Sequence, residues 1–179
     1  MRRLPKKLAN YRRRYHWLRL KEKLPMGPLY INVEATNACN LKCTTCSRDG
    51  TRKLGFMDLE LFRKIIDQAV ESDVYEVSLF LAGESLLHKQ LPEMVEYTVS
   101  NGLESWLVTN GVLLTREKSQ ALLDAGLENI WISLDGDCKE DYEALRVGAN
   151  YEEVLQNVLD LLTLKKQRGT DRPDVRIHM

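Results

Sequence analysis

Three of the four cysteines in this 179-residue chain lie within eight residues, as Cys39, Cys43 and Cys46 of a CxxxCxxC segment. Thiolates are soft ligands that suit zinc, copper(I) and iron–sulfur clusters. Three of them on one short loop can wrap a single cluster, as ferredoxin loops do. A disulfide framework would instead spread an even number of cysteines through a small secreted chain. The spacing therefore indicates a metal or redox site.

A closed site of this kind needs a fourth ligand, and the sequence contains no second CxxC unit. None of the three histidines, His16, His88 and His178, adjoins the cysteines. Cys138 could in principle complete the set, but we interpret it as a small, partly buried residue. With three ligands, one coordination position stays open. On zinc this is a catalytic arrangement, and on a cubane cluster it leaves one iron free to bind a substrate or cofactor.

Short apolar segments alternate with amphipathic ones from residue 29 onward. The pattern predicts strands over residues 29–34, 75–81, 105–108, 129–134 and 175–179, and helices over residues 58–72, 92–100, 116–125, 140–145 and 151–167. Such alternation implies parallel pairing through right-handed crossovers, and hence an α/β sheet or barrel. The last predicted strand has no helix after it, so we expect residues 29–179 to be a core truncated at its C-terminus.

Polar residues gather at the ends of these predicted strands. They are the cysteine loop, Gly83-Glu84, Asn110-Gly111 and Asp135-Gly136. The carboxyl ends of parallel strands converge on one face, where α/β sheets and barrels collect their ligand sites. Each glycine lets the backbone approach a ligand closely. Any one pair is also a common turn, but four such loci at successive strand ends indicate a single site.

The CxxxCxxC loop after a first strand resembles the signature of the radical S-adenosylmethionine superfamily. The resemblance covers about residues 29–179. It implies a partial TIM-like (β/α) barrel of about five parallel strands with crossover helices. The spacing of apolar residues before this region predicts a basic N-terminal helix that precedes the barrel. It also implies that Cys39, Cys43 and Cys46 hold a 4Fe–4S cluster whose open iron is chelated by the amino and carboxylate groups of S-adenosylmethionine.

The same resemblance implies an activity. An electron from a donor such as flavodoxin or ferredoxin would cleave S-adenosylmethionine homolytically, and the resulting 5′-deoxyadenosyl radical would abstract hydrogen from the substrate. No motif in the chain identifies the substrate, for which we consider a peptide or a small molecule.

Two further segments resemble motifs of this superfamily. Gly83-Glu84 is similar to its GGEP segment, which binds the methionine amino group, although Ala82 and Ser85 replace the first glycine and the proline. Thr109-Asn110-Gly111 is similar to its TNG segment. The resemblance therefore implies that Gly83, Glu84 and Asn110 bind the cofactor.

Three other residues receive roles from the resemblance, and Asp135 is added as our own candidate. Ser133 stands in Ile132-Ser133-Leu134-Asp135-Gly136, which is similar to the SLDG segment whose serine contacts the cofactor. Arg146 matches an arginine that reaches the cofactor carboxylate. Thr45 occupies a position that is often aromatic and lies near the adenine, where it offers its backbone and a small side chain. Asp135 is our candidate acid or base.

The net charge of zero hides an asymmetry. Residues 1–23 carry ten Lys and Arg against one acid, Glu22, whereas the rest of the chain carries sixteen basic and twenty-five acidic residues. One helical face in this segment is apolar, formed by Leu4, Leu8, Tyr11, Tyr15 and Leu18. We define residues 1–28 as a basic amphipathic arm and expect its apolar face to pack on the body. Binding to a membrane surface or to nucleic acid is the alternative.

No apolar run approaches the ~18 residues of a membrane span, and the basic start lacks the apolar stretch of a signal peptide. We therefore expect a cytoplasmic enzyme. Two other functions stay open. One is a non-enzymatic iron–sulfur or zinc redox module, with Cys138 or a partner's ligand closing the site. The other is a protein that binds nucleic acid through the arm in a salt-sensitive way.

Overall fold

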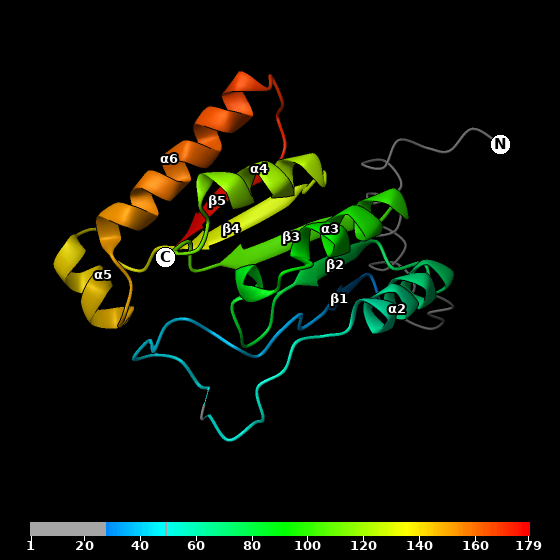
Figure 1. Cartoon of the computed structure of the whole chain (residues 1–179), viewed down its shortest axis with the longest axis horizontal. Coiled ribbons are helices and arrows are strands. Elements are labelled where there is room, and N and C mark those ends of the chain that lie inside the picture. The colour runs from blue at the N-terminus through cyan, green and yellow to red at the C-terminus, as the bar shows by residue number, and fades with distance from the viewer. Residues whose placement is uncertain (1–27, 49) are drawn as a thin grey trace, which may run out of the picture.

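The computed structural model describes residues 28–48 and 50–179, and within them five parallel strands form one sheet (Figure 1). In spatial and chain order they are β1 (Tyr30–Asn32), β2 (Glu76–Leu79), β3 (Glu104–Thr109), β4 (Asn129–Ser133) and β5 (Asp174–His178). Each strand pairs with the next one along the chain. The predicted partial TIM-like (β/α) barrel of about five parallel strands is confirmed. The predicted N-terminal helix and arm lie outside the described residues, apart from Pro28.

Helices connect successive strands from β2 onward, and α2 leads from the cysteine loop into β2. They are α2 (Leu59–Glu71), the short 3₁₀ turn η1 (Ser85–Leu87), α3 (Leu91–Ser100), α4 (Arg116–Asp124), α5 (Lys139–Leu145) and α6 (Tyr151–Gln167). The α-helices begin and end within one residue of the predicted bounds. Local capping explains this agreement, because the predicted cap Thr115 accepts a hydrogen bond from the Lys118 amide at 3.4 Å. Within the described ranges, no helix is long and apolar enough to cross a bilayer.

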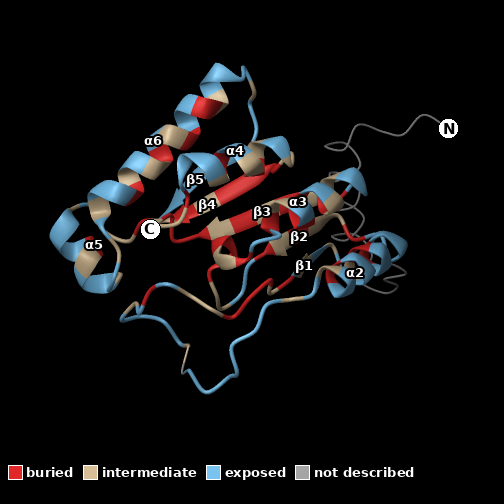
Figure 2. Ribbon diagram, in the orientation of Figure 1, coloured by how far each residue is buried: buried red, intermediate tan, exposed pale blue. Residues whose placement is uncertain are grey.

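The core lies between the helices and one face of the sheet. Figure 2 shows buried residues running along the strands, and Val77, Leu107 and Ile130 have no exposed surface. Burial of such side chains contributes about 1.5–3 kcal/mol each. Val70 is an apolar residue of α2 whose side chain is 42% exposed. The buried residues of α2 recur at Phe62, Ile66 and Ala69, and Val70 lies beyond the edge of that stripe.

The other face of the sheet carries partly exposed side chains, because successive residues of a strand point to opposite faces. Aromatic rings gather here on the last three strands. Trp106 on β3 packs edge-on against Trp131 on β4, with ring centroids 5.2 Å apart. Trp131 in turn stacks on His178 of β5, with centroids 5.9 Å apart and ring planes 11° from parallel. We call these three rings the aromatic wall.

The long loop that carries the cysteines is closed at its base. Thr36 and Phe56 form an isolated antiparallel bridge, and the Met57 amide donates to the Ala35 carbonyl at 2.8 Å. The Thr36 hydroxyl donates to the Gly55 carbonyl at 2.7 Å, and the Gly55 amide donates to the Asn37 side chain at 2.8 Å. The loop is therefore anchored on both sides where it leaves β1 and where it approaches α2.

Candidate functional site

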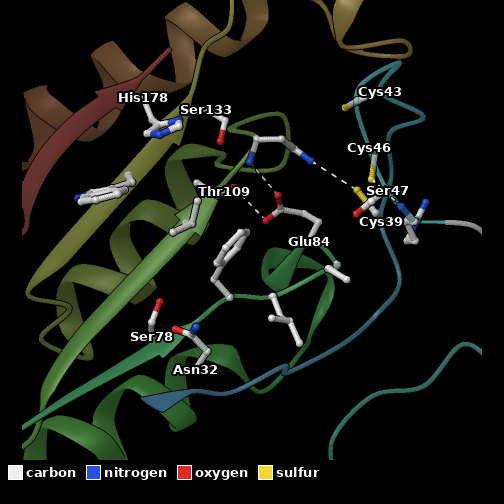
Figure 3. Close-up of a pocket in the computed structure, with 18 of the residues that line it drawn as sticks. Asn32, Cys39, Cys43, Cys46, Ser47, Ser78, Glu84, Thr109, Ser133 and His178 are labelled. Carbon is white, nitrogen blue, oxygen red and sulfur yellow. Dashed lines mark hydrogen bonds between the residues drawn. The ribbon is translucent and has the colours of Figure 1, made fainter. Parts of the chain in front are cut away.

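A cavity of about 900 Å³ opens at the carboxyl ends of the strands (Figure 3). The residues predicted to bind the cluster or the cofactor, together with Asp135, all line it: Cys39, Cys43, Thr45, Cys46, Gly83, Glu84, Asn110, Ser133, Asp135 and Arg146. They come from the cysteine loop, the ends of β2, β3 and β4, and the end of α5. Parallel pairing brings together segments that are more than a hundred residues apart along the chain.

The Arg48 side chain stabilises the fold of the cysteine loop. Its guanidinium donates to the Asn37 carbonyl at 3.1 Å and to the Leu41 carbonyl at 3.3 Å, and so joins two parts of the loop. No local pattern in the sequence indicates this role, because it depends on how the loop folds back on itself.

The far side of the loop is fixed to the end of α5. The Lys42 amide donates to the Val147 carbonyl at 3.0 Å, and the Thr44 amide donates to the Leu145 carbonyl at 2.9 Å. These two carbonyls flank Arg146. The contact that docks the loop therefore also carries the Arg146 side chain to the cysteines.

The donor set fits an iron–sulfur cluster with an open position. Cys39, Cys43 and Cys46 are free thiols on one loop, and all three face one cavity. Burial raises the pKa of the Cys39 thiol, so binding of a metal there displaces a proton. Cys138 does not line this cavity, and its sulfur instead lies within 4.8 Å of carboxylate oxygens of Asp137 and Asp141. Within the described residues, no fourth cysteine joins the three.

Glu84 links the ends of β2 and β3. Its carboxylate accepts hydrogen bonds from the Leu86 amide at 3.1 Å, the Thr109 hydroxyl at 2.9 Å and the Asn110 amide at 2.8 Å. The residue is only 2% exposed, and burial raises the pKa of this carboxyl despite the three donors. All three partners belong to the chain, so this carboxylate fixes the geometry of the cavity wall.

Gly83 packs backbone against backbone. A Cβ atom at this position would lie 2.1 Å from the Thr36 carbonyl oxygen and 2.6 Å from that of Ala38. The next amide, of Glu84, donates to the Ala38 carbonyl at 2.7 Å. Only glycine allows the turn after β2 to approach the start of the cysteine loop this closely.

Asp135 and Arg146 form an ion pair in the cavity wall. The Arg146 Nε donates to Asp135 Oδ2 at 2.8 Å, and Nη2 bonds to the same oxygen. The remaining guanidinium nitrogen, Nη1, lies 3.9 Å from Cys43 Sγ. One guanidinium thus touches both the candidate acid or base and a candidate cluster ligand.

Asn110, Ser133 and Thr45 differ in how firmly they are held. The Asn110 side chain donates to Asn40 Oδ1 at 2.9 Å and to Cys39 Sγ at 3.9 Å. The Ser133 hydroxyl faces the cavity with no hydrogen bond to the described residues (Figure 3). Thr45 is exposed at the rim. The last two are therefore available to a ligand.

The aromatic wall of the cavity, Trp106, Trp131 and His178, was not among the residues predicted from the sequence. For the two tryptophans, the alternation of residues along their strands could have predicted it. Trp106 neighbours Leu107 and Trp131 neighbours Ile132, and both of these neighbours are completely buried. Period-two alternation puts each tryptophan on the opposite face of its strand.

A sequence model of the Radical SAM superfamily matches residues 33–172. The chain belongs to this superfamily. Membership implies a 4Fe–4S cluster and S-adenosylmethionine as cofactors, and the donor set described above fits both.

Curated relatives within the radical SAM superfamily carry out different reactions. A probable GTP 3′,8-cyclase of Methanococcus maripaludis (strain C5) is 34% identical over 131 residues, which are 72% of this chain and 43% of that protein. A PqqA peptide cyclase of Rhodopseudomonas palustris is 34% identical over 111 residues, or 61% of this chain and 29% of that protein. The chain therefore spans less than half the length of either relative.

Solved structures share the fold of this radical SAM chain. Streptococcus suis SuiB bound to S-adenosylmethionine superposes with a TM-score of 0.70, over 95% of this chain and 38% of that one, at 20% identity. The structure of anSMEcpe with bound S-adenosylmethionine gives a TM-score of 0.67 at 23% identity, over 84% of this chain and 43% of that one. At these identities the likeness establishes the fold alone.

We predict that Gly83→Ala displaces the cysteine loop. The added methyl group would overlap the Thr36 carbonyl, so the free energy of unfolding should fall by about 1–3 kcal/mol. Iron and sulfide bound per chain after anaerobic reconstitution should fall as well. Gly55→Ala is the matched control, because a Cβ there meets nothing within 4 Å. Full cluster loading in Gly83→Ala would contradict the prediction.

We predict that Glu84 makes the stability of the apoprotein depend on pH. Its folded-state pKa is raised above the ordinary 4.5, so the folded chain binds more protons than the unfolded chain over that range. The free energy of unfolding should therefore rise as pH falls from about 7 to about 5, and Glu84→Gln should reduce this rise. Urea titrations across this pH range measure it.

The control for this experiment is Glu117→Gln. Hydrogen bonds to its own amide and to Thr115 lower the pKa of this exposed carboxyl, so its removal should leave the rise in place. If the wild-type chain and Glu84→Gln show the same pH dependence, the buried carboxyl has no part in it.

Proposed function

We propose that this chain is the catalytic core of a radical SAM enzyme that acts on a peptide. The observation that carries the proposal is the single cavity that holds the three cysteines together with the polar ends of β2, β3 and β4. Cys39, Cys43 and Cys46 would hold the 4Fe–4S cluster. When bound, the cluster and S-adenosylmethionine supply reductive cleavage of the sulfonium carbon–sulfur bond and abstraction of hydrogen from the substrate.

The chain's own groups would orient S-adenosylmethionine against the open iron. The backbone at Gly83 is the candidate partner for the amino group, because the Glu84 carboxylate is already occupied by three donors of the chain. Arg146 is the candidate partner for the carboxylate, since a guanidinium and a carboxylate pair well. The Ser133 hydroxyl and the Thr45 backbone would contact the rest of the molecule.

Asp135 receives a narrower role in this proposal. Its carboxylate is paired with Arg146, and it would hold the guanidinium in the orientation that S-adenosylmethionine needs. A role as acid or base would require this ion pair to open, and it stays a prediction.

We place the enzyme in the cytoplasm with a flavodoxin or ferredoxin as electron donor. Free thiols on one loop are typical of a reducing compartment. The exposed position of Cys46 would bring one edge of the cluster near the protein surface, where a donor protein could reach it.

The walls of the cavity favour a peptide over a nucleoside triphosphate. Within the described residues, Arg48 and Arg146 are the arginines that line it, and it contains no lysine. Both arginines already have partners within the chain. Among the residues that the structure describes, neither arginine is left for a triphosphate, because Arg48 is bonded to loop carbonyls and Arg146 is assigned to the carboxylate of S-adenosylmethionine. The aromatic wall instead suits amino acid side chains.

Replacing single cysteines tests the proposed function. We predict that Cys39→Ala, Cys43→Ala and Cys46→Ala each abolish the electron paramagnetic resonance signal of the reduced cluster and the formation of 5′-deoxyadenosine. Cys138→Ala is the matched control and should retain both, because its sulfur lies outside the cavity. In the wild-type chain, adding S-adenosylmethionine should shift the cluster signal. Zinc bound by the three cysteines, or a signal that ignores S-adenosylmethionine, would instead support a redox or structural module.

A binding measurement tests the substrate class. We predict no saturable binding of GTP to the cluster-loaded chain below about 1 mM, because the described lining leaves no cation for the triphosphate. A dissociation constant above about 1 mM corresponds to a binding free energy of less than about 4 kcal/mol. Equilibrium dialysis with labelled GTP measures this. Micromolar binding of GTP would contradict the proposed peptide substrate while leaving the radical chemistry intact.

A further inference from the structure

Among the described residues, each of the three cysteine sulfurs has at least one N–H group of the chain near it, and Cys39 also receives a hydrogen bond from the Leu41 backbone amide. The Asn110 side chain lies 3.9 Å from Cys39 Sγ. Arg146 Nη1 lies 3.9 Å from Cys43 Sγ, and the Arg48 amide lies 3.5 Å from Cys46 Sγ. We propose that these donors raise the reduction potential of the bound cluster, with the Asp135–Arg146 ion pair setting the size of the effect at Cys43. This inference rests on the proposed function, because it requires a cluster on the three cysteines.

The Asn110 donor is built into the strand ends. The residue is 6% exposed, and its backbone amide is held by the Glu84 carboxylate at 2.8 Å. Its side-chain oxygen accepts from the Val112 amide at 3.0 Å, which fixes the orientation of the amide group. The Nδ2 atom is then left to face Asn40 and Cys39. The donor is therefore in place before any ligand binds.

The Arg146 donor is fixed in a similar way. Two of its guanidinium nitrogens are bonded to Asp135, so the third is directed away from that carboxylate, toward Cys43. The side chain is 17% exposed, so solvent screens its charge incompletely. The backbone on both sides of Arg146 is bonded to the cysteine loop. Loop and guanidinium are thus kept at a constant separation.

The electronic consequence follows from charge. Reduction adds one electron to the cluster and spreads negative charge over its sulfurs. Hydrogen-bond donors and a cation at those sulfurs stabilise the reduced form more than the oxidised form, so the potential rises. The Asp135 carboxylate opposes this effect by offsetting the charge of Arg146. Arg146 and Asp135 therefore have opposite effects on the reduction potential. Replacing each of them should shift the potential in opposite directions.

The test is a redox titration of the reconstituted full chain without S-adenosylmethionine, followed by electron paramagnetic resonance of the reduced cluster. Asn110→Ser keeps an acceptor for the Val112 amide but is too short to reach the sulfur. Arg146→Met removes the donor and its charge at similar length. At a fixed applied potential, each variant should lower the ratio of reduced to oxidised cluster by about tenfold, equivalent to about 59 mV for one electron. Asp135→Asn should raise the ratio.

A control and two outcomes complete the experiment. Arg168 follows the C-terminal end of α6 and pairs with Asp124, whereas Arg146 lies before the N-terminal end of that helix. Arg168→Gln therefore removes one positive charge far along α6 from the cysteines, and it should leave the reduction potential unchanged. A wild-type chain that binds no cluster would overturn the proposed function itself. Variants that load a full cluster at the wild-type potential, or an Asp135→Asn shift in the same direction as Arg146→Met, would overturn only the present inference.

Discussion

The close approach of Gly83 to the start of the cysteine loop is the contact on which the site depends. The turn after β2 lies directly against the carbonyl oxygens of Thr36 and Ala38, where no side chain fits. The following residue, Glu84, bonds to the loop through its amide and to the end of β3 through its carboxylate. One short segment therefore fixes both the loop and the neighbouring strand end.

Burial of the Glu84 carboxylate is costly unless its oxygens are satisfied, and three donors from the chain satisfy them. Such a group stabilises one arrangement over others, because a shift of Asn110 would leave Oε2 without its donor and a shift of Thr109 would leave Oε1 with the Leu86 amide alone. Asp135 contrasts with it. That carboxylate is 29% exposed and, among the described residues, pairs with Arg146 alone, so it can exchange partners at a smaller cost.

The end of α5 joins the residues expected to hold the cluster to those expected to hold S-adenosylmethionine. Carbonyls on either side of Arg146 receive the loop amides of Lys42 and Thr44, and the guanidinium between them faces Cys43. In the proposed function, S-adenosylmethionine would bind beside the cluster that the three cysteines hold. A shared backbone contact is a direct way to keep the two halves of the site in register.

The sequence by itself determined the family, the parallel sheet and the cysteines and polar residues that meet in the cavity, but not its aromatic wall. These follow from local features, such as the cysteine spacing, the Thr115 cap and polar pairs at strand ends, which converge in any parallel sheet. Only the tertiary structure decided that Glu84 bonds to Thr109 and Asn110, that Asp135 pairs with Arg146, and that Arg48 clamps the loop. These contacts depend on distances between segments that no local pattern specifies. The exposed Val70 shows the same limit, since a helical stripe predicts which side is apolar but not how wide the covering surface is.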